Sequence, residues 1–164
     1  MAPAVTLRPV TGRGRVLGID VGARRVGLAI SDASRTLARP LSTLAVSGPA
    51  DAVERVMREI ERLSQELAEE EDDEGLALIV VGAPAHLDGS PSEQTRKVDA
   101  FVAALAARTR LPIAREDERL TSREADSRLA AGERDWRRRK ARLDAAAAAI
   151  ILQDFLDRRE AGGA

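Results

Sequence analysis

Five short stretches of the chain have the length and pattern of β-strands. Three of them come early, at residues 16–20, 25–31 and 38–44, and the short gaps between them predict an antiparallel meander. The fourth, at residues 76–81, is apolar throughout, which is typical of a parallel strand buried on both faces. A fifth strand is predicted at residues 111–116.

Helical periodicity appears before and after the later strands. Between residues 51 and 68, apolar side chains repeat every three or four positions with charged residues between them, which predicts an amphipathic helix. Capping patterns that begin at Ser90 and Thr121 predict two more helices, and an alanine-rich helix is expected from Asp144 to about residue 159. This order favours an α/β fold with a mixed sheet. We expect one domain at residues 15–160, with tails at 1–14 and 161–164.

The composition restricts the kind of site that the chain can build. There is no cysteine and only one histidine, His86, which excludes thiolate metal sites and multi-histidine zinc sites. A metal site would therefore use oxygen ligands, which favour magnesium, manganese or calcium. No apolar run reaches the length of about 18 residues that suggests a membrane span. Residues 1–11 lack the apolar segment of a signal peptide, so we expect a cytoplasmic protein with no membrane partner.

Carboxylates follow two of the predicted strands and stand at the start of the last predicted helix. Asp20 ends the first strand, Asp117 and Glu118 follow the fifth, and Asp144 begins the helix. In open α/β sheets functional groups gather at the carboxyl ends of strands, so these acids could converge if the first and fifth strands lie near the centre. The pattern also fits local roles, as a turn residue, as charges that balance a helix dipole, and as an N-cap.

Positive charge is concentrated in one segment, although the whole chain has a net charge of −1. Residues 132–142 carry six basic residues against two acidic ones, a net charge of +4. Within this segment Arg139, Lys140 and Arg142 lead into Asp144 and are predicted to contact nucleic-acid phosphates, the other interpretation being a solvated linker. Arg119 fits either a contact to the scissile phosphate or an ion pair with a nearby acid.

Four motifs stand in order along nearly all of residues 16–159. The first is GIDVGARRVGLAIS at 18–31, followed by LARPLSTL at 37–44. The second is IVVGAPAHLDGSPSEQT at 79–95, followed by VDAFVAAL at 98–105. The third is EDERLTSREA at 116–125, and the fourth is RKARLDAAAAAIILQDFLD at 139–157. In sequence and in order these motifs resemble the YqgF/RuvX family of Holliday-junction-resolvase-like proteins.

The resemblance implies an RNase H-like fold, with helices on both faces of a mixed five-stranded sheet, and metal-dependent hydrolysis of phosphodiester bonds. Members of the family are linked to processing of the 5′ end of the 16S ribosomal RNA precursor. By motif, the catalytic carboxylates are expected to be Asp20, Glu118 and Asp144, with Asp117 the alternative to Glu118. The same three would hold two Mg²⁺ or Mn²⁺ ions.

Three other functions remain open at this point. A structure-selective DNA junction resolvase would use the same carboxylates and would need a dimer to cut two symmetric strands. A nucleotide-binding lobe of the actin type shares the glycine-containing opening, but such proteins need two lobes. A non-catalytic nucleic-acid adaptor would keep only the basic segment. RNA is the favoured partner, and both a monomer and a homodimer are compatible with the sequence.

Overall fold

The computed structural model describes residues 14–70, 75–83, 93–117 and 136–162, with only the backbone described at 136–143 and 160–162. It contains the five expected strands in the expected order. Their bounds are β1 (Arg15–Val21), β2 (Arg25–Ser31), β3 (Ala38–Ala45), β4 (Leu76–Ala83) and β5 (Ile113–Asp117). The helices are α1 (Pro49–Ala68), α2 (Glu93–Ala106) and α4 (Trp136–Gly162).

All five strands form one mixed sheet, in the order β3-β2-β1-β4-β5. The first three strands pair antiparallel, which confirms the meander, and β4 and β5 extend the sheet on the other side of β1 in parallel. This places β1 at the centre. The condition under which the acids were expected to converge is met only for the first strand, because β5 is the edge strand and β4 separates it from β1.

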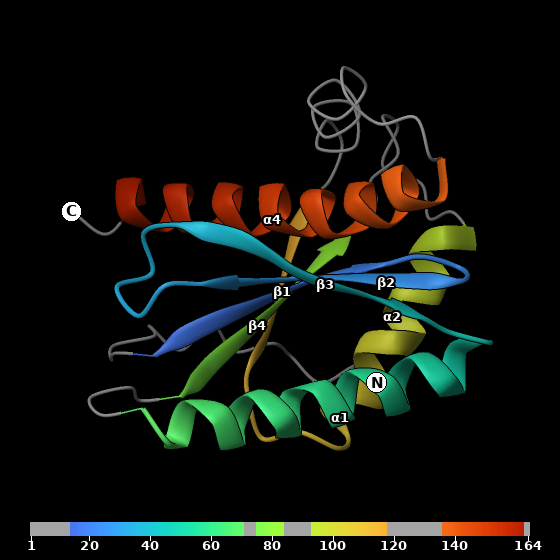
Figure 1. Ribbon diagram of the computed structural model, residues 1–164, viewed down its shortest axis with the longest axis horizontal. Helices are drawn as coiled ribbons and strands as arrows, with labels where there is room; N and C mark the ends of the chain where they lie inside the picture. The colour runs from blue at the N-terminus through green and yellow to red at the C-terminus, as the bar shows by residue number, and fades with distance from the viewer. Residues whose placement is uncertain (1–13, 71–74, 84–92, 118–135, 163–164) are drawn as a thin grey trace.

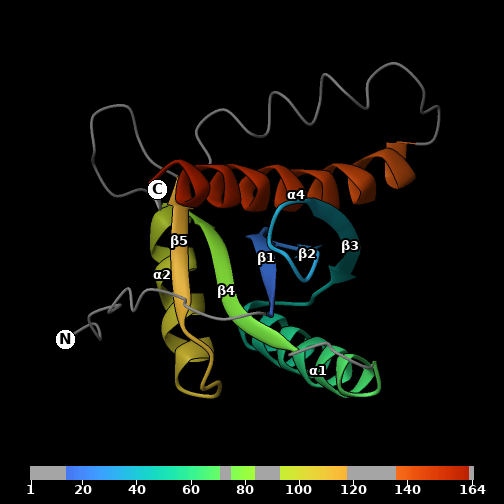
Figure 2. The same ribbon diagram turned by 90° about the vertical axis from the view of Figure 1, so that its left-hand side faces the viewer.

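The helices cover the two faces of the sheet, as expected (Figure 1). α1 and α2 lie on one face, where Leu17 and Ile19 of β1 are fully buried among aliphatic side chains. α4 crosses the other face from β3 to β5 (Figure 2), and there Val16 of β1 and Val80 of β4 pack against Ile151. Alternate residues of β1 therefore point to different helical layers, as the period of two in a strand requires.

The last helix is longer than the sequence predicts, because α4 begins at Trp136 and not at Asp144. Residues 136–143 contain neither glycine nor proline, and the arginine, lysine, alanine and leucine among them are strong helix formers. Asp144 therefore lies about two turns inside the helix, so the interpretation of this residue as an N-cap is wrong. The basic residues from 137 to 142 are helical, which excludes an irregular linker there.

Two further details bear on the sequence-based boundaries. β5 starts at Ile113, after Pro112, which has no N–H to donate to the sheet and whose carbonyl accepts a hydrogen bond from the Ile79 amide at 3.0 Å. The helix predicted to begin at Thr121 lies outside the described residues. Within the described ranges, no helix combines the length and apolar character needed to cross a membrane.

Candidate active site

Asp20 and Asp144 come together through the glycine that stands between them. Asp20 is paired with Gly27 across the antiparallel β1–β2 ladder. Directly opposite residues in such a ladder project to the same face of the sheet. A Cβ added to Gly27 would lie 2.0 Å from the carbonyl oxygen of Asp144, so the backbone of α4 rests on β2 at this position. Gly27, the neighbour of Asp20 on the sheet, is therefore the residue that α4 contacts at Asp144.

A second glycine, Gly18, extends this close approach along β1. It lies two residues before Asp20 and therefore faces α4 as well. A Cβ at Gly18 would lie 2.9 Å from the Leu152 Cβ and 3.1 Å from the Ala148 carbonyl oxygen. Glycine normally weakens the interior of a strand because it adds no packing surface. Here two glycines remove the side chains that would hold α4 away from the sheet, and both candidate acids depend on that approach.

The structure adds a carboxylate that the sequence analysis left without a role. Glu116 of β5 is only 6% exposed and belongs to the face covered by α4, where it pairs with Arg158. In the β4–β5 ladder Glu116 is level with Gly82. The β1–β4 ladder pairs Ile19 with Val81, so its next step brings Asp20 level with Gly82 too. Asp20 and Glu116 thus lie in one row across the sheet, with backbones about 10 Å apart.

The surroundings of Glu116 disfavour its ionised form. Burial raises the pKa of the Glu116 carboxyl, the positive charge of Arg158 opposes that rise, and the negative charges of Asp154 and Asp117 add to it. Its charged partner is supplied by α4 itself, so Glu116 joins the edge strand to the helix. The signal in the sequence was the alternation of β5, since Glu116 shares the parity of the buried Ala114.

The same alternation separates Asp117 from the candidate site. Arg115 pairs with Asp99 of α2, which shows that this parity of β5 faces the layer of α1 and α2. Asp117 has the parity of Arg115 and is therefore assigned to that layer, away from the face on which Asp20 and Gly27 meet α4. The strand geometry consequently does not favour Asp117 as the alternative metal ligand. Glu118 and Arg119 lie outside the described residues.

The two acids that the structure brings together suit a hard divalent cation. Both Asp20 and Asp144 are partly exposed. Carboxylate oxygens are the donors that Mg²⁺ and Mn²⁺ prefer. Among the residues that the structure describes, no cluster of three or more histidine, cysteine or acidic side chains has the geometry of a metal site. The third expected ligand, Glu118, is not among those residues, so the described site consists of two carboxylates.

The basic residues of the fourth motif stand on the two turns of α4 that precede Asp144. Arg139, Lys140 and Arg142 belong to the helical backbone there, and their side chains are outside the described part of the chain. Lys140 precedes Asp144 by one turn of helix. The positive charge noted in the sequence is therefore attached rigidly to the element that carries Asp144.

Comparison with known proteins identifies the family to which the chain is similar. Residues 14–158 match the family model of RuvX, described as Holliday junction resolvase. A protein of Pelotomaculum thermopropionicum named "Putative pre-16S rRNA nuclease" is 36% identical over 154 residues, covering 91% of this chain and 94% of the relative. A protein of the same name from Chloroflexus aggregans is 40% identical over 144 residues, covering 88% of this chain and 94% of the relative.

Among solved structures, the chain resembles T. thermophilus RuvC in complex with a Holliday junction substrate. The TM-score is 0.50 at 22% identity, with 90% of this chain and 96% of that chain covered, and the likeness concerns the fold. It confirms the RNase H-like architecture that the motifs imply. Because a family model matches most of the chain and its relatives exceed 30% identity along nearly their whole length, the protein belongs to the RuvX family of nucleases.

Proposed function

We propose that the protein is a metal-dependent nuclease that hydrolyses phosphodiester bonds of RNA, in processing of the 5′ end of the 16S ribosomal RNA precursor in the cytoplasm. The observation that carries this proposal is the contact between Gly27 and the backbone of Asp144, which brings a second carboxylate-bearing residue beside Asp20. The names of the curated relatives supply the substrate.

Asp20 and Asp144 would hold the metal from β1 and α4, and Glu118 would complete the ligand set from the segment after β5. Bound Mg²⁺ or Mn²⁺ would activate water and stabilise the charge on the attacked phosphate, as in two-metal nucleases. The contribution of the protein to catalysis would be to hold the metal-binding residues in a defined arrangement. One acid lies on the central strand and the other on a helix in backbone contact with the neighbouring strand, so the backbones that carry both acids are held in place by the fold.

The basic start of α4 supports a grip on nucleic acid next to this site. Within the described residues, the first two turns of α4 carry a run of basic residues and no acidic one. Cations near a helix N-terminus are unfavourable by a few tenths to about 1 kcal/mol each. Basic residues that destabilise the helix in the free protein would be stabilised by a bound anion, and the phosphate backbone of a nucleic acid is such an anion.

A junction resolvase is the second candidate, because the matching family model is described as Holliday junction resolvase. It would use the same carboxylates on four-way DNA, and symmetric cutting of two strands would require a homodimer. Substrate preference separates the two candidates, whereas loss of the acids affects both alike.

The test compares cleavage of matched single-stranded RNA, duplex DNA and four-way junction substrates in Mg²⁺ and in Mn²⁺. Wild type, Asp20→Asn and Asp144→Asn are assayed together with Glu61→Gln, a control at an exposed acid of α1. We expect cleavage of RNA by wild type and the control, and a loss of at least a hundredfold in both Asp variants. Cleavage that survives both substitutions would refute the site, and preference for the junction would establish the second candidate.

A further inference from the structure

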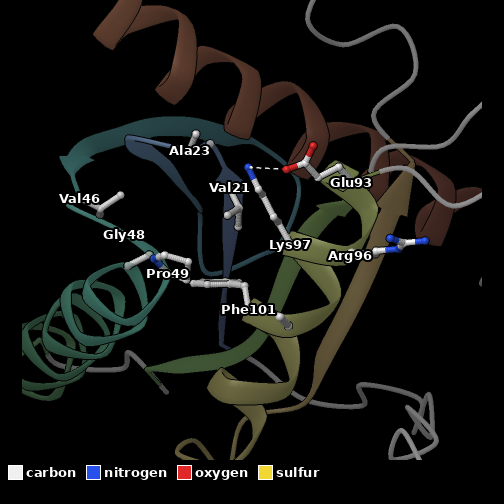
Figure 3. A pocket seen from close by; sticks show the side chains of 12 residues that line it. Val21, Ala23, Val46, Gly48, Pro49, Glu93, Arg96, Lys97 and Phe101 are labelled. Atoms are coloured by element: carbon white, nitrogen blue, oxygen red, sulfur yellow. Dashed lines mark ion pairs between the residues drawn. The ribbon is translucent and has the colours of Figure 1, made fainter.

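A cavity of about 450 Å³ lies behind the candidate active site, on the face of the sheet covered by α1 and α2. It is bounded by the β1–β2 turn, the start of α1 and the first turns of α2 (Figure 3). Cavities of this size are typical of sites for small organic groups. The volume exceeds that of a single nucleobase, so a base and part of its sugar would fit.

The walls of the cavity are apolar and its rim carries one ion pair. Besides two glycines and the charged residues Glu93, Arg96 and Lys97, the lining consists of seven apolar side chains: Val21, Ala23, Val46, Pro49, Ala52, Ala100 and Phe101. At the rim, Lys97 extends from α2 towards Val21 and its ammonium lies 3.7 Å from the Glu93 carboxylate (Figure 3). Both of these charged side chains are largely exposed. An exposed pair of this kind contributes about 0–1 kcal/mol, so Lys97 can exchange Glu93 for another anion at little cost.

The cavity is connected to the candidate active site through consecutive residues of β1. Asp20 projects to the face of α4, and Val21, the next residue, projects to the opposite face and lines the cavity. The Gln94 side-chain amide donates a hydrogen bond of 2.9 Å to the Val21 carbonyl, which fixes the first turn of α2 to the end of the strand. A nucleic-acid strand that crosses this end of β1 would therefore meet the candidate acid and the cavity in succession.

We propose that the cavity receives one unpaired base of the substrate strand, close to the phosphodiester bond that is cut, and that Lys97 contacts an adjacent phosphate. The inference rests on the proposed function and specifies its substrate as a strand with an unpaired base at this position. An apolar chamber with a movable cation at its rim suits the flat apolar faces of a base joined to an anionic backbone. Splayed bases of single-stranded RNA commonly stack on aromatic side chains, and Phe101 of the lining is such a side chain.

The test measures binding separately from cleavage. Fluorescently labelled single-stranded RNAs, identical except for one abasic site moved along the strand, are titrated with the protein in Ca²⁺ and followed by anisotropy. Wild type should lose roughly tenfold in affinity at one abasic position and little elsewhere. Ala100→Phe, at an exposed position that lines the cavity, should bind the complete RNA as weakly as wild type binds that abasic RNA. Ala103→Phe, at an exposed position of α2 outside the lining, is the matched control, and thermal melts verify that both variants fold.

Equal affinity of wild type for all the RNAs, absence of binding, or an abasic effect that persists in Ala100→Phe would overturn the proposal. Cleavage assays with Asp20→Asn decide the proposed function independently. An abasic effect in a protein that does not cleave RNA would refute the nuclease proposal and keep the base site. Cleavage of RNA with no abasic effect would keep the nuclease proposal and refute the base site.

Discussion

Gly27 of β2 lies directly beneath the carbonyl oxygen of Asp144 in α4, close enough that a single added methyl group would overlap that oxygen. This contact brings the helix onto the sheet next to Asp20. It makes the site sensitive to a substitution that removes no functional group, because a side chain at position 27 must push the backbone of α4 away.

We expect the cost of alanine to follow the space available at each glycine. Gly27→Ala should destabilise by about 3 kcal/mol or more, because the obstacle is backbone, and should abolish cleavage with both acids present. Gly18→Ala should cost about 1–2 kcal/mol, since part of its obstacle is the Leu152 side chain. Gly48→Ala, with nothing within 4 Å of the added methyl group, is the control. Urea denaturation measures the series, and equal losses at Gly27 and Gly48 would contradict the close approach.

Metal binding should stabilise the wild-type protein. Mn²⁺ at about 100 times its Kd should raise the Tm by roughly 5–10 °C, because the ion binds the folded chain preferentially. Asp20→Asn and Asp144→Asn each remove one of the two described candidate ligands and should lose most of this increase. Differential scanning fluorimetry with and without Mn²⁺ makes the measurement, with Glu61→Gln expected to match wild type. Identical Tm increases in all four proteins would exclude both aspartates as ligands.

The buried carboxyl of Glu116 should make stability depend on pH. Burial raises its pKa above the ordinary value of 4.5, so between that value and the folded pKa the folded state binds more protons than the unfolded state. Linkage then requires the free energy of unfolding to fall as pH rises through this window. Glu116→Gln removes the effect, so its Tm relative to wild type should increase from about pH 4 to about pH 8. A difference in Tm that stays constant, or that decreases with pH, would contradict the direction of the pKa shift.

Binding of nucleic acid should depend on the basic turns of α4. Replacing Arg139, Lys140 and Arg142 with alanine should weaken binding and lower the salt dependence by about one unit of log–log slope per lost phosphate contact. The loss should be similar for different sequences, since phosphate contacts carry no base information. Affinity is measured across a range of salt concentrations. A matched control replaces three exposed arginines of α1, Arg55, Arg58 and Arg62, and should leave the slope unchanged. An unchanged slope in the α4 variant would place the phosphate contacts elsewhere.

Most of the secondary-structure elements and the family could be predicted from the sequence. The central strands β1, β2 and β4 appeared as largely apolar stretches, because burial between two layers leaves a local pattern in the sequence, and the helix at 51–68 appeared through its period. The position of Asp20 at the end of β1 could also be predicted, because the end of a strand is marked by neighbouring residues in the sequence.

The contacts between these elements could not be predicted from the sequence. Strand order placed β5 at the edge, and the parity of β5 assigned Glu116 and Asp117 to opposite layers. The helix α4 starts at Trp136 and includes the basic residues from 137 to 142. Each outcome depends on contacts between segments far apart in the chain. Gly27 is the clearest example. Nothing within β2 requires a glycine at this position, and the requirement arises because a helix more than a hundred residues later packs its backbone against it.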